Sequence, residues 1–160
     1  MVLVRILEPD QFDPDGGCFN SSAFTPSKSD KSISAFDLAC ADAASGGPCA
    51  HIARFYPERI PASGAPVYYW IFDPGKIPAP QAPTPKAKVK NHRVVQSRSK
   101  SGDDCHQGIF DLSDGVRRRF FKTGHYDEVT KRFIDVFRCN GGRLEKIDTT
   151  ADLPELYAAR

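Results

Sequence analysis

The sequence lacks any long hydrophobic run, and the apolar stretch at its beginning is short. VLVRIL, residues 2–7, is followed at once by Glu8, Pro9 and Asp10. A membrane-spanning helix needs about 18 or more consecutive apolar residues, and a signal peptide needs a longer apolar core than this one. We therefore expect a cytoplasmic protein that has no membrane partner.

The cysteines are widely and irregularly spaced. The chain contains five cysteines, an odd number, and no CxxC pair. In a cytoplasmic protein, widely spaced cysteines are typical of free thiols, several of them buried. The missing CxxC pair also removes the usual signature of a structural zinc site. We therefore expect reduced cysteines and no bound cofactor.

Several signatures of nucleotide and nucleic-acid binding are missing as well. The sequence has no GxxxxGK(S/T) phosphate-binding loop, no RNA-recognition or zinc-finger signature and no internal repeat. The length of 160 residues, with 40% hydrophobic and 26% charged side chains, is typical of one globular domain. We therefore expect a single domain over 1–160, and its function has to be inferred from charge and from local clusters.

Charge is distributed unevenly along the chain. Residues 76–122 carry eleven basic and four acidic side chains, whereas 1–75 and 123–160 are both net acidic. A localised basic field of this kind can steer an anionic partner, such as a nucleic acid or an acidic protein. A solvated linker and helix face is the alternative interpretation. The candidate anion-binding residues are Lys86, Lys88, Lys90, Arg93, Arg98, Lys100, Arg117, Arg118 and Arg119.

Strand patterns recur along the chain. β-branched and aromatic residues, or alternation of polar and apolar residues, predict strands at 2–7, 32–36, 51–57, 67–73, 91–99, 106–112 and 143–148. Residues 67–73 are the most apolar of these, so we expect that strand to be central. Arg5 is the only charge in the first strand. Segments 91–99 and 106–112 are expected to form an antiparallel hairpin with residues 103–106 at its tip.

Helical patterns are fewer. Asp37 is placed to cap a helix over 37–44, and further helices are expected over 114–122, 124–139 and 149–160. The helix over 124–139 has an apolar stripe at three- and four-residue spacing. Its members are Tyr126, Val129, Phe133, Val136 and Phe137.

Runs of strands followed by helices favour an α+β fold. We expect one domain with a mostly antiparallel sheet of five or six strands. The C-terminal helices over 114–122 and 124–139 are expected to pack on one face of the sheet. A Pro/Lys-rich crossing should run over 74–90.

The sequence Asp103-Asp104-Cys105-His106 is the strongest local cluster of reactive groups. A catalytic cysteine needs a base, and neighbouring side chains on a strand diverge, so His92 across the hairpin is a better base for Cys105 than His106. His51 and His125 are further candidates. On this interpretation His106, Cys105, Asp104 and His92 would form the site of a small hydrolase or nuclease.

Two other interpretations of the same cluster remain open. Cys49, His51, Cys105 and His106 together offer four nitrogen and sulfur ligands, which suit tetrahedral zinc. Alternatively, the two aspartates only form a turn at the hairpin tip, with Cys105 half-buried.

Three segments together resemble a group of uncharacterised small bacterial proteins. The segments are the first strand at 3–7, SSAFTPSKSDKSIS at 21–34 and CHQGIFDLS at 105–113, about a third of the chain. The resemblance implies a bacterial origin but no activity, and it draws attention to His106. The expected function is thus a cytoplasmic interaction module whose basic middle segment meets an anionic partner, with the small hydrolase as the alternative.

Overall fold

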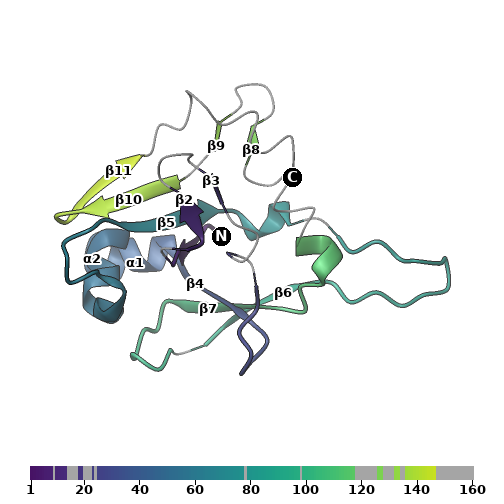
Figure 1. The fold of residues 1–160 in the computed structure, drawn as a ribbon. Coiled ribbons are helices and arrows are strands. Elements are labelled where there is room, and N and C mark those ends of the chain that lie inside the picture. The colour runs from purple at the N-terminus through teal and green to yellow at the C-terminus, as the bar shows by residue number, and fades with distance from the viewer. Residues whose placement is uncertain are drawn as a thin grey trace.

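A computed structural model describes residues 1–8, 10–13, 18–19, 23, 25–77, 79–97, 99–117, 126–127, 132–133 and 136–146. The fold is α+β and is built on a seven-stranded antiparallel sheet with the order β11-β10-β5-β1-β4-β7-β6 (Figure 1). The strands of this sheet are β1 (Leu3–Ile6), β4 (Ile33–Asp37), β5 (Val67–Phe72), β6 (Arg93–Gln96), β7 (His106–Phe110), β10 (Val136–Asn140) and β11 (Arg143–Lys146).

The remaining elements are short. Two pairs of two-residue strands are β2 (Phe12–Asp13) with β3 (Cys18–Phe19), and β8 (Tyr126–Asp127) with β9 (Arg132–Phe133). The helices are α1 (Leu38–Ser45), α2 (Pro48–Phe55) and the 3₁₀ turns η2 (Pro57–Arg59) and η3 (Pro74–Lys76), and residues 114–117 are also helical.

Strand β5 is central and buried, as its sequence predicted. It pairs with β1 on one side and β10 on the other. Alternate side chains enter two different hydrophobic clusters, because successive residues of a strand point to opposite faces of a sheet. Trp70 and Phe72 stack at 4.6 Å in one cluster, whereas Val67 and Tyr69 belong to the other, which includes residues of α1 and α2.

Helix α1 begins where the sequence indicated. The Asp37 side chain accepts a hydrogen bond from the Cys40 N–H at 2.9 Å, and Gly46 ends the helix in the left-handed conformation. Pro48 then opens α2 at a position where a proline costs no hydrogen bond. The strand predicted over 51–57 is therefore wrong. Cys49 and Ile52 are buried at helical spacing, and the seven-residue segment was too short to separate a period of 2 from one of 3.6.

The helix predicted over 124–139 is also wrong for the residues described there. Residues 126–127 and 132–133 are extended, and Val136–Asn140 forms strand β10, with Val136 opposite Trp70 of β5. Gly141 and Gly142 both have positive φ and form the turn from β10 into β11. The sheet thus has seven strands rather than five or six, and α1 and α2 contribute to the hydrophobic cluster on one of its faces.

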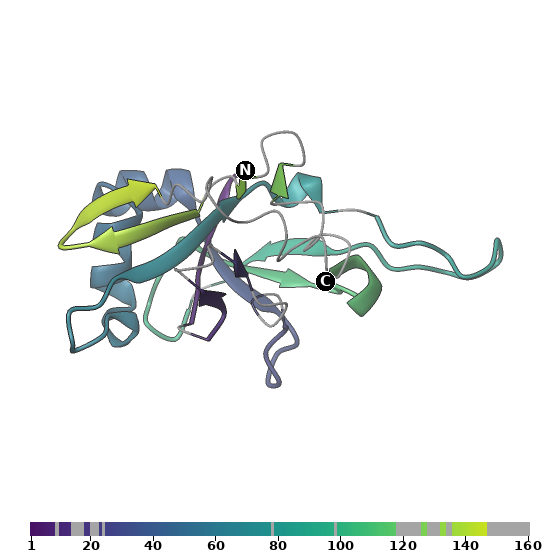
Figure 2. The same ribbon diagram turned by 45° about the horizontal axis from the view of Figure 1, so that its top comes forward.

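The hairpin of β6 and β7 is confirmed, with Val94 opposite Ile109 and Gln96 opposite Gln107. Residues 79–92 contain no helix or strand and project from the body of the molecule, in the region predicted as a crossing (Figures 1 and 2). The helix over 114–122 is seen at 114–117, and its remainder and the helix over 149–160 lie outside the described residues.

Candidate functional site

The turn before β7 contains a disulfide bond. Cys105 is bonded to Cys40 of α1, 65 residues away, with a Cα–Cα distance of 5.5 Å. The expectation of free thiols is therefore wrong for these two cysteines, while Cys49 and Cys139 are free. Period and spacing gave no signal for this pair, because the pairing of β4 with β7 brings together two cysteines that are 65 positions apart in sequence.

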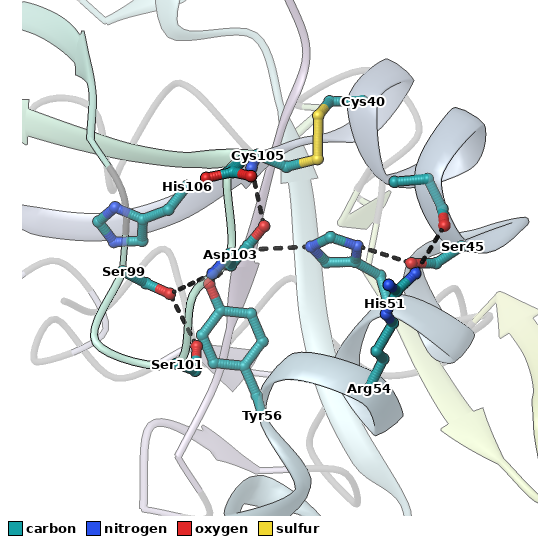
Figure 3. A network of polar contacts seen from close by, with 12 residues as sticks. Cys40, Ser45, His51, Arg54, Tyr56, Ser99, Ser101, Asp103, Cys105 and His106 are labelled. Carbon is teal, nitrogen blue, oxygen red and sulfur yellow. Dashed lines mark hydrogen bonds and ion pairs between the residues drawn. A yellow bond between two sulfur atoms is a disulfide. The ribbon is translucent and has the colours of Figure 1, made fainter.

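The four residues at 103–106 lie in different environments. Asp103 is completely buried and Cys105 is nearly so, whereas Asp104 is exposed and His106 is half-buried. Figure 3 shows the His106 ring on the opposite side of the chain from the disulfide. The sequence cluster is thus divided between a buried network and the surface.

Asp103 is the centre of the buried network. Its carboxylate accepts hydrogen bonds from the Tyr56 hydroxyl at 2.5 Å and from the Cys105 N–H at 2.8 Å (Figure 3). The His51 Nε2 atom lies 3.0 Å from the Asp103 Oδ2 atom, with both side chains fully buried. Burial, reinforced by the bond to Asp103, raises the pKa of Tyr56, so that its hydroxyl remains a donor. The network joins α2 to the turn before β7.

His106 is the first residue of β7, and its ring contacts serines on both sides of that strand. Its Nε2 atom is 2.8 Å from the Ser34 hydroxyl of β4, and its Nδ1 atom is 3.0 Å from both the hydroxyl and the carbonyl oxygen of Ser97. Because a carbonyl oxygen can only accept, Nδ1 carries a hydrogen. In the neutral ring Nε2 is then an acceptor, and the Ser34 hydroxyl donates to it.

Ser34 and His106 both line a cleft on the surface of the described part of the chain. The cleft has a volume of about 530 Å³. Its polar lining includes six serine hydroxyls, three basic side chains and three carboxylates. These are Ser27, Ser29, Ser34, Ser97, Ser99, Ser101, Arg5, Arg59, Lys100, Glu8, Asp30 and Glu58, together with the aromatic rings of Phe36 and Tyr56.

Arg5 lies just beyond the paired residues of β1 and β4. The two strands pair only through Leu3 with Asp37 and Val4 with Phe36, and beyond that point the Arg5 guanidinium donates to the carbonyl oxygens of Ala23 and Ser34. Within the part of the chain that the structure describes, no carboxylate forms an ion pair with Arg5. Burial, and then the neighbouring Arg59 cation, lower the pKa of Arg5 to about 10, which still leaves it charged at neutral pH.

The other cleft charges are largely compensated. Arg59 is ion-paired with Glu8, and Asp30 accepts hydrogen bonds from the Ser27 hydroxyl and the Ser32 N–H. The Ser27 bond, followed by the Ser32 bond, lowers the pKa of Asp30. Arg5 therefore differs from its neighbours, because its described partners are neutral.

The predicted catalytic residues do not come together. Cys105 has no thiol while it is in the disulfide, and Asp104 is on the surface. Ser97, which follows β6, reaches His106, whereas His92 precedes β6 and lies roughly 16 Å farther along the extended chain. His125 lies outside the described residues. Of the predicted set, only His106 lines the cleft.

The predicted metal ligands are also divided. His51 and Cys105 do belong to one buried cluster, which Asp103 completes. Cys49 instead contacts the Tyr69 hydroxyl, at 3.8 Å, and His106 faces the cleft.

The predicted basic residues occupy several places. Lys86 and Lys88 are exposed on the projecting segment, Lys90 and Arg93 are ion-paired with Asp111, and Lys100 lines the cleft. Arg117 contacts Asp114 and Thr25. Arg98, Arg118 and Arg119 lie outside the described residues. Binding of an anionic partner to these residues stays a prediction, which a titration with nucleic acid at several salt concentrations would test.

Most of the residues that line the cleft were not predicted from the sequence. Arg5 carried a signal, a lone charge within an apolar strand, whereas Ser34 and Ser97 looked like ordinary polar positions of alternating strands. No family model matches the chain, and neither a curated protein nor a solved structure matches it. Among the described helices, none combines the length and the apolarity that crossing a membrane requires.

Proposed function

We propose that the protein binds a small ligand bearing an anionic group, such as a phosphate, in the cleft beside Arg5 and His106. The observation that supports this most is the Arg5 guanidinium, a half-buried cation whose described partners are two carbonyl oxygens. A planar guanidinium carries five N–H donors in an arrangement that matches the geometry of phosphate and carboxylate. Such an anion would also offset the repulsion between Arg5 and Arg59.

The rest of the cleft fits a ligand of mixed character. The hydroxyls of Ser34, Ser97 and Ser99 provide both donors and acceptors, whereas the partly exposed Ile6 and Tyr56 provide apolar surface. A volume of about 530 Å³ falls within the range of small-molecule sites. We therefore expect a phosphorylated metabolite or a nucleotide rather than a free inorganic ion.

Replacement of Arg5 by alanine should weaken phosphate-ligand binding by about 10- to 100-fold. A hydrogen bond to a charged group contributes roughly 1.5–3 kcal/mol, and each 1.4 kcal/mol changes the dissociation constant tenfold. The measurement is calorimetric titration of the wild type and the variant with phosphate, pyrophosphate and adenosine monophosphate.

Arg54→Ala is the matched control for this titration. Arg54 also donates to a carbonyl oxygen, that of Ala44, but it lies on α2 outside the cleft. Thermal unfolding of each variant shows whether it is folded. Equal affinities of the wild type and a folded Arg5→Ala protein would disprove the proposal, as would a wild type that binds none of the three ligands.

The Ser34–His106 pair supports a second candidate function, hydrolysis of an ester or a phosphoester. Serine as nucleophile, Nε2 of histidine as general base and a carbonyl that orients Nδ1–H form the geometry of nucleophilic catalysis. In this arrangement the Ser34 oxygen would attack the ester, and His106 would take its proton and return it to the leaving group. This candidate retains His106 from the sequence prediction but replaces its partners.

If the second candidate is correct, Ser34→Ala and His106→Gln should each lower turnover of an activated ester by at least about 100-fold. Chromogenic carboxylic esters and phosphodiesters are suitable substrates, followed by absorbance. Ser29→Ala is the control, because Ser29 lines the same cleft but contacts only Ser27 among the contacts identified. A folded Ser34→Ala variant with unchanged turnover would mean that the cleft is a binding site only.

A further inference from the structure

The buried network around Asp103 contains the ligand atoms of a metal site. His51, Asp103 and Cys105 each offer one ligand atom, and these atoms lie within 4.8 Å of one another. Cys40 brings a fourth, because its sulfur is bonded to that of Cys105. The two sulfurs, the imidazole nitrogen and the carboxylate oxygen correspond to the donor types of tetrahedral zinc.

The His51 ring supplies an independent observation. The ring is fully buried between Phe36 and Phe55, each at 4.7 Å, and its Nδ1 atom lies 3.1 Å from the Ser45 hydroxyl. Its Nε2 atom is 3.0 Å from the Asp103 carboxylate, yet a hydrogen on Nε2 would not point at that oxygen. Nε2 therefore has no hydrogen-bond partner among the described residues, although it is directed into the cluster. A buried polar atom in this state is costly.

The nitrogen and the carboxylate face each other without a well-directed hydrogen. If His51 is neutral and its Nδ1–H donates to Ser45, both Nε2 and the Asp103 oxygen are acceptors, and two acceptors 3.0 Å apart repel. A cation bound by both atoms would remove this repulsion. The contacts of Ser45 with His51 and of Tyr56 with Asp103 are also of the kind that orient metal ligands.

We propose that Cys40, His51, Asp103 and Cys105 bind one zinc ion when the Cys40–Cys105 disulfide is reduced. The disulfide and the metal are then two alternative cross-links of the same junction between α1, α2 and β7. Two thiolates on one zinc lie about 3.8 Å apart, as follows from Zn–S bonds of about 2.3 Å and a tetrahedral angle. The Cα–Cα distance of 5.5 Å allows this separation through rotation of the two side chains. Thiolates also favour zinc over magnesium and calcium.

The change between the two states is a two-electron reaction. A thiol or phosphine reductant breaks the S–S bond, and each protein sulfur gains one electron and one proton. The thiol reductant becomes a disulfide, whereas the phosphine takes oxygen from water and becomes a phosphine oxide. Zinc then displaces both thiol protons as two Zn–S bonds form. Cys40 is the more exposed of the two cysteine residues.

The site lies next to the cleft without being part of it. Cys105 and His106 are consecutive, and their side chains lie on opposite sides of the chain (Figure 3). The cross-link, in either form, holds the start of β7 and therefore the position of His106. The zinc proposal does not depend on ligand binding in the cleft.

The test is native mass spectrometry of the full-length protein equilibrated with zinc, in the presence and absence of a phosphine reductant. The reduced protein should carry one zinc ion and the oxidised protein none, and subsequent oxidation with peroxide should release the metal. Magnesium at the same concentration should not bind. A reduced wild type that remains free of zinc would overturn the proposal.

Variants locate the metal. Cys40→Ser and Cys105→Ser should each lose zinc, and His51→Asn should bind it at least about tenfold more weakly. Cys49→Ser and Cys139→Ser are the controls, since both residues are free thiols outside the cluster. Burial also raises the pKa of Cys139 to about 12, which disfavours the thiolate form that binds a metal. If the control variants lose the metal and the cluster variants keep it, the proposed site is wrong.

A spectroscopic measurement covers the case in which a buried variant does not fold. Cobalt bound to the reduced wild type should show sulfur-to-cobalt charge-transfer absorption of tetrahedral form, with an intensity that corresponds to two thiolates. Cobalt bound without such absorption would exclude Cys40 and Cys105 as ligands and overturn the proposal.

Discussion

Reduction of the Cys40–Cys105 disulfide in metal-free buffer should lower the free energy of unfolding by about 4 kcal/mol. The bond closes a loop across 65 positions of sequence, and the chain-entropy model gives this magnitude for a loop of that length. Loss of the cross-link acts mainly on the unfolded chain, which gains conformational freedom. The measurement is urea unfolding of the oxidised and the reduced protein, both with a chelator present.

A double variant, Cys40→Ala with Cys105→Ala, provides the control. Its unfolding midpoint should be the same with and without reductant, because no other disulfide is formed by the described residues. A wild type whose stability is unchanged by reduction would mean that the bond adds nothing beyond the contacts around it. Addition of zinc to the reduced wild type should restore part of the lost stability if the metal site exists.

The sequence was a good guide to elements whose signals are local. The helix of residues 38–45 was predictable because Asp37 caps it and Gly46 ends it. The β6–β7 hairpin was predictable because two segments of strand composition are joined by a short stretch of turn-forming residues at 99–104. In each case the residues that determine the element lie within or beside it.

The sequence misled where a strand is determined by distant partners. Apolar residues over 126–137 fall at helical spacing, but Val136 and Phe137 pair with Trp70 and Tyr69 of the central strand. Pairing with β5 holds these residues in an extended conformation and overrides the weak preference of a short segment for helix. The helical period in the sequence was therefore not evidence against a strand.

The candidate site was predictable only in part. His106 was identified because it follows an unusual acidic and thiol cluster, but its partners Ser34 and Ser97 lie on other strands and look unremarkable in sequence. Of the two neighbouring aspartates, Asp104 was the one predicted to take part in catalysis. Which of two adjacent side chains is buried depends on how the turn packs against α2, and composition does not determine that.

The difference between these two aspartates gives the second large expected effect. Asp103→Ala should lower the free energy of unfolding by about 3–5 kcal/mol, which is the range for removal of one partner from a buried polar network. The Tyr56 hydroxyl and the Cys105 N–H would each lose an acceptor inside the protein. The His51 ring would lose its nearest polar neighbour as well.

Asp104→Ala is the control for this measurement and should change the stability by less than about 1 kcal/mol, because Asp104 is exposed. Both variants are compared by urea unfolding in the oxidised, chelator-treated state, so that zinc contributes nothing to the difference. Equal effects of the two substitutions would contradict the burial of Asp103. A large effect of Asp103→Ala alone means that the network holds α2 against the start of β7, and with it the position of His106 at the edge of the cleft.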